Sequence, residues 1–122
     1  IPDFEGVLFT GIQTRKDFMA SNPAAVSGLV KATVEAMRAI SADPVAAAKV
    51  MKAGGFADFD EGDLVSTIRA MGDAFKPRTQ SLADWKRTQE IFRTAVSDPA
   101  LASVEIKEGD FWTNRFVEEA MK

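Results

Sequence analysis

The fold is decided by residues 22–40, which read NPAAVSGLVKATVEAMRAI. Asn22 offers a side-chain acceptor at a helix N-cap, and Pro23 stands at the first helical position, where its missing N–H costs no hydrogen bond. Bulky apolar residues recur at helical spacing on one face: Val26, Leu29, Val30, Val34, Met37 and Ile40. Other sides carry small residues that let a second backbone approach: Gly28, Ala32, Ala36 and Ala39. This pattern predicts a long helix that packs on more than one side.

Similar signals divide the rest of the chain into helices. Two further starts repeat the pairing of a capping residue with proline: Asp43-Pro44 and Asp98-Pro99. Two more have the spacing of a capping box: Thr14 with Asp17, and Ser81 with Asp84. Helix ends are marked by Gly54-Gly55 and Lys76-Pro77. We expect helices at residues 15–21, 23–41, 44–53, 61–75, 82–96 and 111–121, so the isolated chain is predicted to be mostly α, with five to six helices.

Before the first helix, Val7-Leu8-Phe9-Thr10-Gly11-Ile12 has the composition of a β-strand. A lone strand cannot satisfy its own backbone donors and acceptors, so it must pair with other chain. We therefore expect one N-terminal strand whose partner lies outside this chain, and the same partner would cover the small-residue side of residues 22–40. The sequence also begins Ile1-Pro2, which fits an internal cut or a processing site as well as a complete gene product.

Composition excludes several classes of function. The 122 residues are 46% hydrophobic and 27% charged, as in one globular domain. The formal net charge of −3 provides no positive field that would gather phosphates, so no nucleic-acid partner is expected. Histidine and cysteine are absent, which removes disulfides, thiol nucleophiles and the commonest acid or base at neutral pH. We expect no catalytic residues, no metal and no cofactor.

Two acidic clusters each allow a functional and a structural interpretation. The first resembles part of a calcium loop, but Gly62 lies one position early and Arg69 stands where a bidentate glutamate belongs. Its members are Asp58, Asp60, Glu61 and Asp63. An N-cap at Asp60 with acidic residues in the first helical turn explains them better. The second cluster could supply an acid/base pair, but a solvated loop is the better interpretation because no apolar pocket is visible to shift the pKa values. Its members are Glu105, Glu108 and Asp110.

The order of these motifs resembles the C-terminal part of periplasmic solute-binding proteins, in the family that binds nitrate, sulfonates, taurine and thiamine precursors. The similar stretches are, in order, Thr14–Met19 leading into Ala20-Ser21-Asn22-Pro23, then Glu35-Ala36-Met37, Asp43–Ala48, Ser81–Trp85 and Asp110–Ala120. The resemblance as a whole, in the order and spacing of these stretches, extends over nearly all of the chain. One departure lies at Thr94-Ala95-Val96, where the family often has a glycine that closes this helix.

The resemblance implies a bilobed protein of two α/β lobes, of the type II periplasmic-binding-protein class, with the ligand held between the lobes. Residues 1–122 would form a single partial domain, the C-terminal portion of the first lobe. The implied function is capture of a small anionic or heteroaromatic solute and its delivery to an ABC permease, in the periplasm or another extracytoplasmic space. The implied partners are the missing N-terminal part of the same protein, the permease and the solute.

Candidate ligand residues follow from the rule that open α/β sheets bind ligands beyond the carboxyl ends of their strands. This rule points to Phe9, Thr10, Gly11 and Gln13. Thr10 offers a hydroxyl, and Gly11 permits a close backbone approach. The alternative is that Phe9 is sheet core, Gly11 a local bulge and Gln13 a solvated turn residue. The backbone amides that open the helix after Thr14 are a further candidate, for an anion.

Two other functional classes remain open. A small helical interaction module with no ligand of its own would pair residues 7–12 across a two-fold axis, as a homodimer or a domain swap. An enzyme is also conceivable, because a pyrimidine-synthesising branch resembles these binding proteins, but that branch depends on histidine and cysteine chemistry. Trp85 and Trp112 are expected to be packing anchors rather than open stacking platforms.

Overall fold

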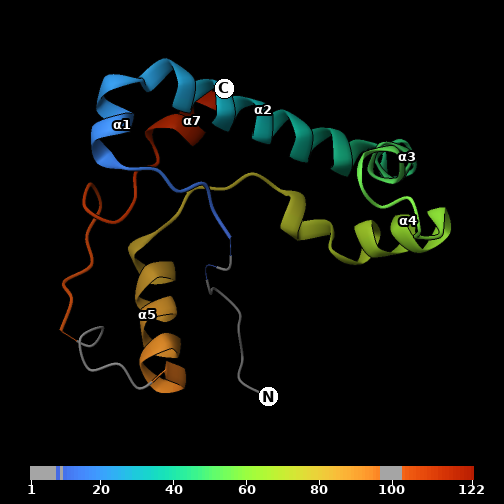
Figure 1. Cartoon of the computed structure of the whole chain (residues 1–122). Coiled ribbons are helices and arrows are strands. Elements are labelled where there is room, and N and C mark those ends of the chain that lie inside the picture. The colour runs from blue at the N-terminus through green and yellow to red at the C-terminus, as the bar shows by residue number, and fades with distance from the viewer. Residues whose placement is uncertain (1–7, 9, 97–102) are drawn as a thin grey trace.

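The computed structural model describes residues 8, 10–96 and 103–122 (Figure 1). Its elements are, in chain order, α1 (Lys16–Ser21), α2 (Pro23–Ala42), α3 (Pro44–Gly54), α4 (Glu61–Ala70), the 3-10 helix η1 (Gly72–Phe75), α5 (Leu82–Val96) and α7 (Arg115–Met121). Within the described residues, the β pairing consists of an isolated bridge between Glu108 and Trp112. The prediction of a mostly α chain is therefore confirmed.

Most of the predicted helix starts are confirmed. Helices begin at residues 23, 44, 61 and 82 as expected, and α1 begins one residue later than expected, at Lys16. The helix predicted over 61–75 is divided, because α4 ends at Ala70 and η1 follows it. Lys76, before Pro77, is extended with φ −91° and ψ 117°, so this proline does mark a helix end.

The last helix begins at Arg115, four residues after the predicted start at 111. A turn occupies the preceding residues, because the Gly109 amide donates to the Trp112 carbonyl at 2.8 Å. Gly109 has φ 87°, a left-handed conformation that glycine adopts without strain. The amides of Asp110 and Phe111 both donate to the Lys107 carbonyl, at 3.3 and 3.2 Å. With these bonds the segment forms a loop turn, and the helix begins only after it.

Two of the predicted N-caps are confirmed by their hydrogen bonds. Asp43 Oδ1 accepts from the amides of Val45 and Ala46 at 3.1 and 2.9 Å, at the start of α3. Asp60 Oδ1 accepts from the amides that follow it at 2.7 and 3.2 Å, at the start of α4. Ser81 and Asp84 form the expected reciprocal box, since the Ser81 amide donates to Asp84 Oδ2 and the Asp84 amide donates to Ser81 Oγ.

Other predicted caps are wrong or lie outside the described residues. Asn22 stands at the start of α2 but its side chain makes no cap hydrogen bond; its Nδ2 donates to Ser21 Oγ instead, at 2.9 Å. Thr14 does not cap α1, because Arg15 is the N-cap residue there and also lacks a side-chain cap bond. Asp98-Pro99 lies outside the described residues.

The strand predicted over Val7–Ile12 is wrong at each position that the structure describes. Leu8 and residues 10–12 have no regular secondary structure, while Val7 and Phe9 lie outside the described residues. The Leu8 amide donates to the hydroxyl of Thr88 on α5, at 2.9 Å, and not to a neighbouring strand. Strand composition is a local property, whereas pairing needs a second strand, which the described part of this chain does not supply.

The long helix α2 organises the packing. It is contacted by α1 near its start, by α7, and by α3 and η1 towards its end (Figure 1). Val26 and Val34 of α2 and Phe116 of α7 are buried, with 6%, 3% and 5% of their surface exposed. A second cluster joins α3 to α4 and consists of Ala48, Leu64 and Ile68, with Ile40 and Phe75 packed against it. In Figure 1, α5 projects from the connecting segments, away from α2.

The two predicted sides of α2 differ in burial. Its bulky face supplies the buried valines, but all four small residues on the other side are exposed: Gly28, Ala32, Ala36 and Ala39. The expected cover for this small-residue side is not provided by the described part of the chain, so a covering partner stays a prediction. None of the described helices combines the length and the apolar character needed to cross a membrane.

Candidate functional site

Two connecting segments meet at Gln80, just before α5. The Gln80 amide donates to Asn114 Oδ1 at 2.9 Å, and Asn114 Nδ2 donates to the Gln80 carbonyl at 2.8 Å. The side chain of Gln80 accepts from Trp85 Nε1 at 2.9 Å. All three residues are half-buried. We call Gln80, Trp85, Trp112 and Asn114 the Gln80 junction, because they join the segment before α5 to the segment before α7.

The junction also touches the segment predicted to bind ligand. A Cβ atom built on Gly11 would lie 3.6 Å from Gln80 Nε2, an ordinary van der Waals distance. Gly11 therefore lies against the junction, although this contact would admit an alanine. The structure brings Gly11 together with Gln80, a residue that sequence reasoning did not select.

The other predicted ligand residues are less constrained. Thr10 and Gln13 are exposed and make no hydrogen bond to another described residue, while Phe9 lies outside the described residues. Since the segment is not a strand, the strand-end argument that selected these residues loses its basis in this chain. Their hydroxyl and amide groups remain available to a solute, so a binding role for them stays a prediction.

The aromatic side of the junction is a packed cluster. The rings of Trp85 and Trp112 stack with their centroids 5.7 Å apart and their planes 18° apart. Phe111 packs against Trp85 at 6.0 Å in a tilted arrangement. The expectation that the tryptophans are packing anchors is confirmed. Trp112 Nε1 is buried without a hydrogen-bond partner among the described residues, an arrangement that costs stability.

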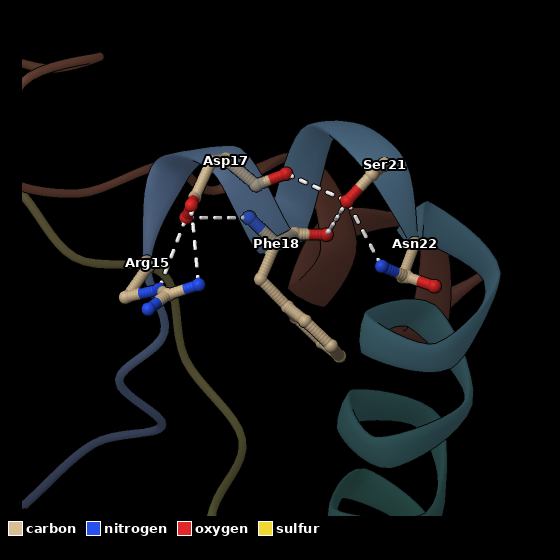
Figure 2. Close-up of polar contacts among 5 residues, drawn as sticks. All are labelled: Arg15, Asp17, Phe18, Ser21 and Asn22. Atoms are coloured by element: carbon tan, nitrogen blue, oxygen red, sulfur yellow. Dashed lines mark hydrogen bonds and ion pairs between the residues drawn. The ribbon is translucent and has the colours of Figure 1, made fainter.

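At the start of α1, where the sequence offered backbone amides as a candidate anion site, the side chain of Asp17 lies in the first turn. Figure 2 shows Asp17 beside Arg15, with Asp17 Oδ1 accepting from the Phe18 amide at 2.8 Å and from Arg15 Nε at 3.1 Å. Ser21 Oγ donates to the Asp17 carbonyl at 2.8 Å (Figure 2). A carboxylate paired with Arg15 thus lies in the first turn of α1, and anion binding there stays a prediction.

The acidic loop before α7 forms exposed ion pairs, as the solvated-loop interpretation predicts. Lys16 Nζ lies 2.9 Å from Asp110 Oδ1, and Lys107 Nζ lies 3.7 Å from Asp110 Oδ2 and 3.8 Å from Glu105. The hydrogen bond from Lys16, with the charge of that lysine, lowers the pKa of Asp110 below its ordinary value. In the structure Asp110 is therefore an exposed ion-pair partner of Lys16 and Lys107.

A separate open pocket of about 280 Å³ lies where α2, α3, α4 and η1 meet. Its residues are Ile40, Ser41, Pro44, Ile68, Arg69, Gly72, Asp73, Phe75 and Lys76. Lys76 and Asp73 are paired at 2.6 Å; their hydrogen bond raises the pKa of Lys76 and lowers that of Asp73. No predicted ligand residue lines this pocket. Among the described residues, no group of three or more acidic side chains is arranged to hold a metal ion.

Sequence reasoning missed the residues that hold the junction. Asn114 had one signal, its position directly before a helix, but this signal suggests a cap rather than a bond to Gln80. Gln80 had none beyond its place before the Ser81 capping box. Comparison of the chain with protein-family models, with curated proteins and with solved structures finds no match.

Proposed function

We propose that this chain is part of a solute-binding protein of two α/β lobes, of the type II class, and forms the C-terminal portion of its first lobe. The whole protein would capture a small anionic or heteroaromatic solute and deliver it to an ABC permease, in the periplasm or another extracytoplasmic space. The proposal rests on the order of the motifs along the sequence. The observation in the structure that supports it is the uncovered small-residue side of α2.

The extent of exposed apolar surface gives further support. Leu29, in the middle of α2, is 56% exposed, and Val50 of α3 is 72% exposed. Other large apolar side chains are exposed as well, on several elements: Ile12, Phe18, Val45, Met71, Leu82, Phe92, Val104 and Phe111. Exposed apolar side chains in this number offer surface on which other protein can bind. In the proposed parent protein, its missing N-terminal part would cover much of this surface.

The proposed solute contacts are Phe9, Thr10, Gly11 and Gln13, completed by residues of the missing part. The closeness of the Gln80 side-chain amide to Gly11 supports this assignment, because it adds a polar group beside the proposed contacts. We propose binding without catalysis, because the chain has no histidine or cysteine and the two carboxylates with a lowered pKa belong to exposed ion pairs. The proposed protein needs no cofactor.

The test uses the protein as its own gene encodes it. Thermal unfolding is followed with nitrate, taurine, an alkanesulfonate and a thiamine-precursor pyrimidine, since a ligand that binds only the folded state raises Tm. Thr10→Ala should reduce the rise in Tm that the bound solute causes. Thr94→Ala should not reduce it, because the Thr94 hydroxyl donates to the Glu90 carbonyl at 2.9 Å. A full-length protein that none of these solutes stabilises would count against the proposal.

The alternative proposal is a helical interaction module with no ligand. The same exposed apolar side chains favour it, because a second copy of the chain could bury them in a homodimer or a domain swap. The interaction module differs from the solute-binding proposal in its expected behaviour. It should form a defined dimer whose amount depends on protein concentration, without any further part of a parent protein.

A further inference from the structure

The loop between α3 and α4 exposes a pair of aromatic rings. Phe56 is 43% exposed and Phe59 is 56% exposed, and their ring centroids lie 5.6 Å apart with a tilt of 58°. The Phe59 amide donates to the Phe56 carbonyl at 3.1 Å, so a turn holds the two rings together. Neither ring belongs to the apolar cluster between α3 and α4. The pair is therefore an apolar surface that the described part of the chain leaves uncovered.

Negatively charged residues stand next to this pair along the chain. Four carboxylates lie within the same eight residues: Asp58, Asp60, Glu61 and Asp63. No ion pair joins any of the four to a lysine or arginine among the described residues. Asp60 caps α4 through Oδ1, and its Oδ2 takes no part in the capping hydrogen bonds. We call residues 56–63 the aromatic-acidic loop.

The charges indicate what kind of partner would fit. Burial of two phenylalanine rings is favourable, but an acidic or neutral partner would leave the carboxylates desolvated without compensation. A partner with lysine or arginine around an apolar anchor would pair with the carboxylates while its anchor covers the rings. We propose that the aromatic-acidic loop docks a basic protein segment that presents such an anchor.

This proposal goes beyond the solute-binding function and does not depend on it. In Figure 1 the loop lies with α3 and α4 at one end of the drawn molecule, whereas α1 and the segment before it lie towards the other. The predicted solute contacts belong to that segment, so a protein docked on the loop need not touch them.

The test uses the 122-residue chain and three labelled synthetic peptides, with fluorescence anisotropy as the measurement. The first peptide carries a leucine-phenylalanine anchor between lysines, the second replaces the lysines by glutamates, and the third replaces the anchor by serines. The first should bind at least about tenfold more tightly than either of the others, and an increase from about 0.05 M to about 0.5 M salt should weaken it. Equal binding of the first and third peptides would overturn the proposal, because it would reflect charge alone.

Matched variants locate the binding on the chain. Phe59→Ser should weaken the first peptide at least about tenfold, whereas Leu29→Ser should not, although both residues are 56% exposed. Asp58→Asn combined with Asp63→Asn should weaken it more than neutralisation of two exposed carboxylates elsewhere, Glu108→Gln combined with Glu118→Gln. Far-UV circular dichroism checks that each variant is folded.

Two further results would overturn the proposal. One is equal loss of binding in the loop variants and the control variants. The other is self-association of the chain, measured by light scattering, that Phe59→Ser abolishes while leaving peptide binding unchanged, since the occupant would then be a second copy.

Discussion

Asn22 and Asn114 provide a matched pair of substitutions, because each asparagine stands at the N-cap of a helix and neither makes a side-chain cap bond. Asn114 makes two hydrogen bonds to the backbone of Gln80, at 2.9 and 2.8 Å, in a half-buried position. A hydrogen bond contributes about 1 kcal/mol net, and an orphaned buried group costs about 1–3 kcal/mol. Asn114→Ala should therefore lower the free energy of unfolding by about 1–3 kcal/mol.

Asn22→Ala should have a much smaller effect. The side chain of Asn22 bonds only to the exposed Ser21 hydroxyl among the described residues, so its loss should change the free energy of unfolding by less than about 0.5 kcal/mol. A true N-cap would lose about 1 kcal/mol in the same substitution. Comparison of the two variants thus shows whether stability depends on the hydrogen bonds seen in the structure or on the capping motif in the sequence.

The assay is urea unfolding followed by far-UV circular dichroism, with tryptophan fluorescence as a second probe. Fluorescence is informative because Gln80, which Asn114 holds, accepts the hydrogen bond of Trp85 Nε1. Asn114→Ala should therefore also change the emission of the folded protein, while Asn22→Ala should not. Equal losses of stability in the two variants, or a loss below about 0.5 kcal/mol for Asn114→Ala, would refute the reasoning.

Three further predictions concern the core, an ion pair and a helix cap. Ile68→Ala, at a position 3% exposed, should cost about 2–5 kcal/mol in urea unfolding. Val50→Ala, at a position 72% exposed, should change the free energy of unfolding little. Equal losses of stability in the Ile68 and Val50 variants would contradict the packing seen in the structure. Lys16→Gln should raise the pKa of Asp110 in an NMR titration, and an unchanged pKa would show that the pair does not form in solution. Because the pKa of Asp110 is lowered in the folded state, the pair stabilises above the ordinary carboxyl pKa and is lost as pH falls through the lowered one. Asp60→Ala should cost about 0.5–2 kcal/mol through its two amide bonds, and a neutral result would refute the cap.

Local signals in the sequence predicted the helices well, and the exceptions have local physical causes. Asp43 and Asn22 both precede a proline at a helix start, yet only Asp43 caps its helix. The residue before Asp43 is Ala42, which has no polar side chain to compete. The residue before Asn22 is Ser21, whose hydroxyl accepts the amide of Asn22. A capping motif is therefore informative only when its neighbours offer no alternative bond.

Long-range contacts account for what the sequence did not reveal. Gln80 and Asn114 are 34 residues apart, and no periodic pattern links them. The predicted strand failed for a related reason: its composition is local, but its pairing depends on a second segment, and Leu8 bonds to Thr88, 80 residues away. The choice of candidate ligand residues depended on the same pairing, because they were selected from the end of that strand.

The central claim is that this chain is one part of a larger solute-binding protein, and the intact mass of the protein made from its own gene tests it most directly. The account predicts a protein substantially longer than 122 residues, with the additional sequence before Ile1. A gene product of 122 residues that light scattering shows to be a defined dimer would contradict the claim and favour the interaction module.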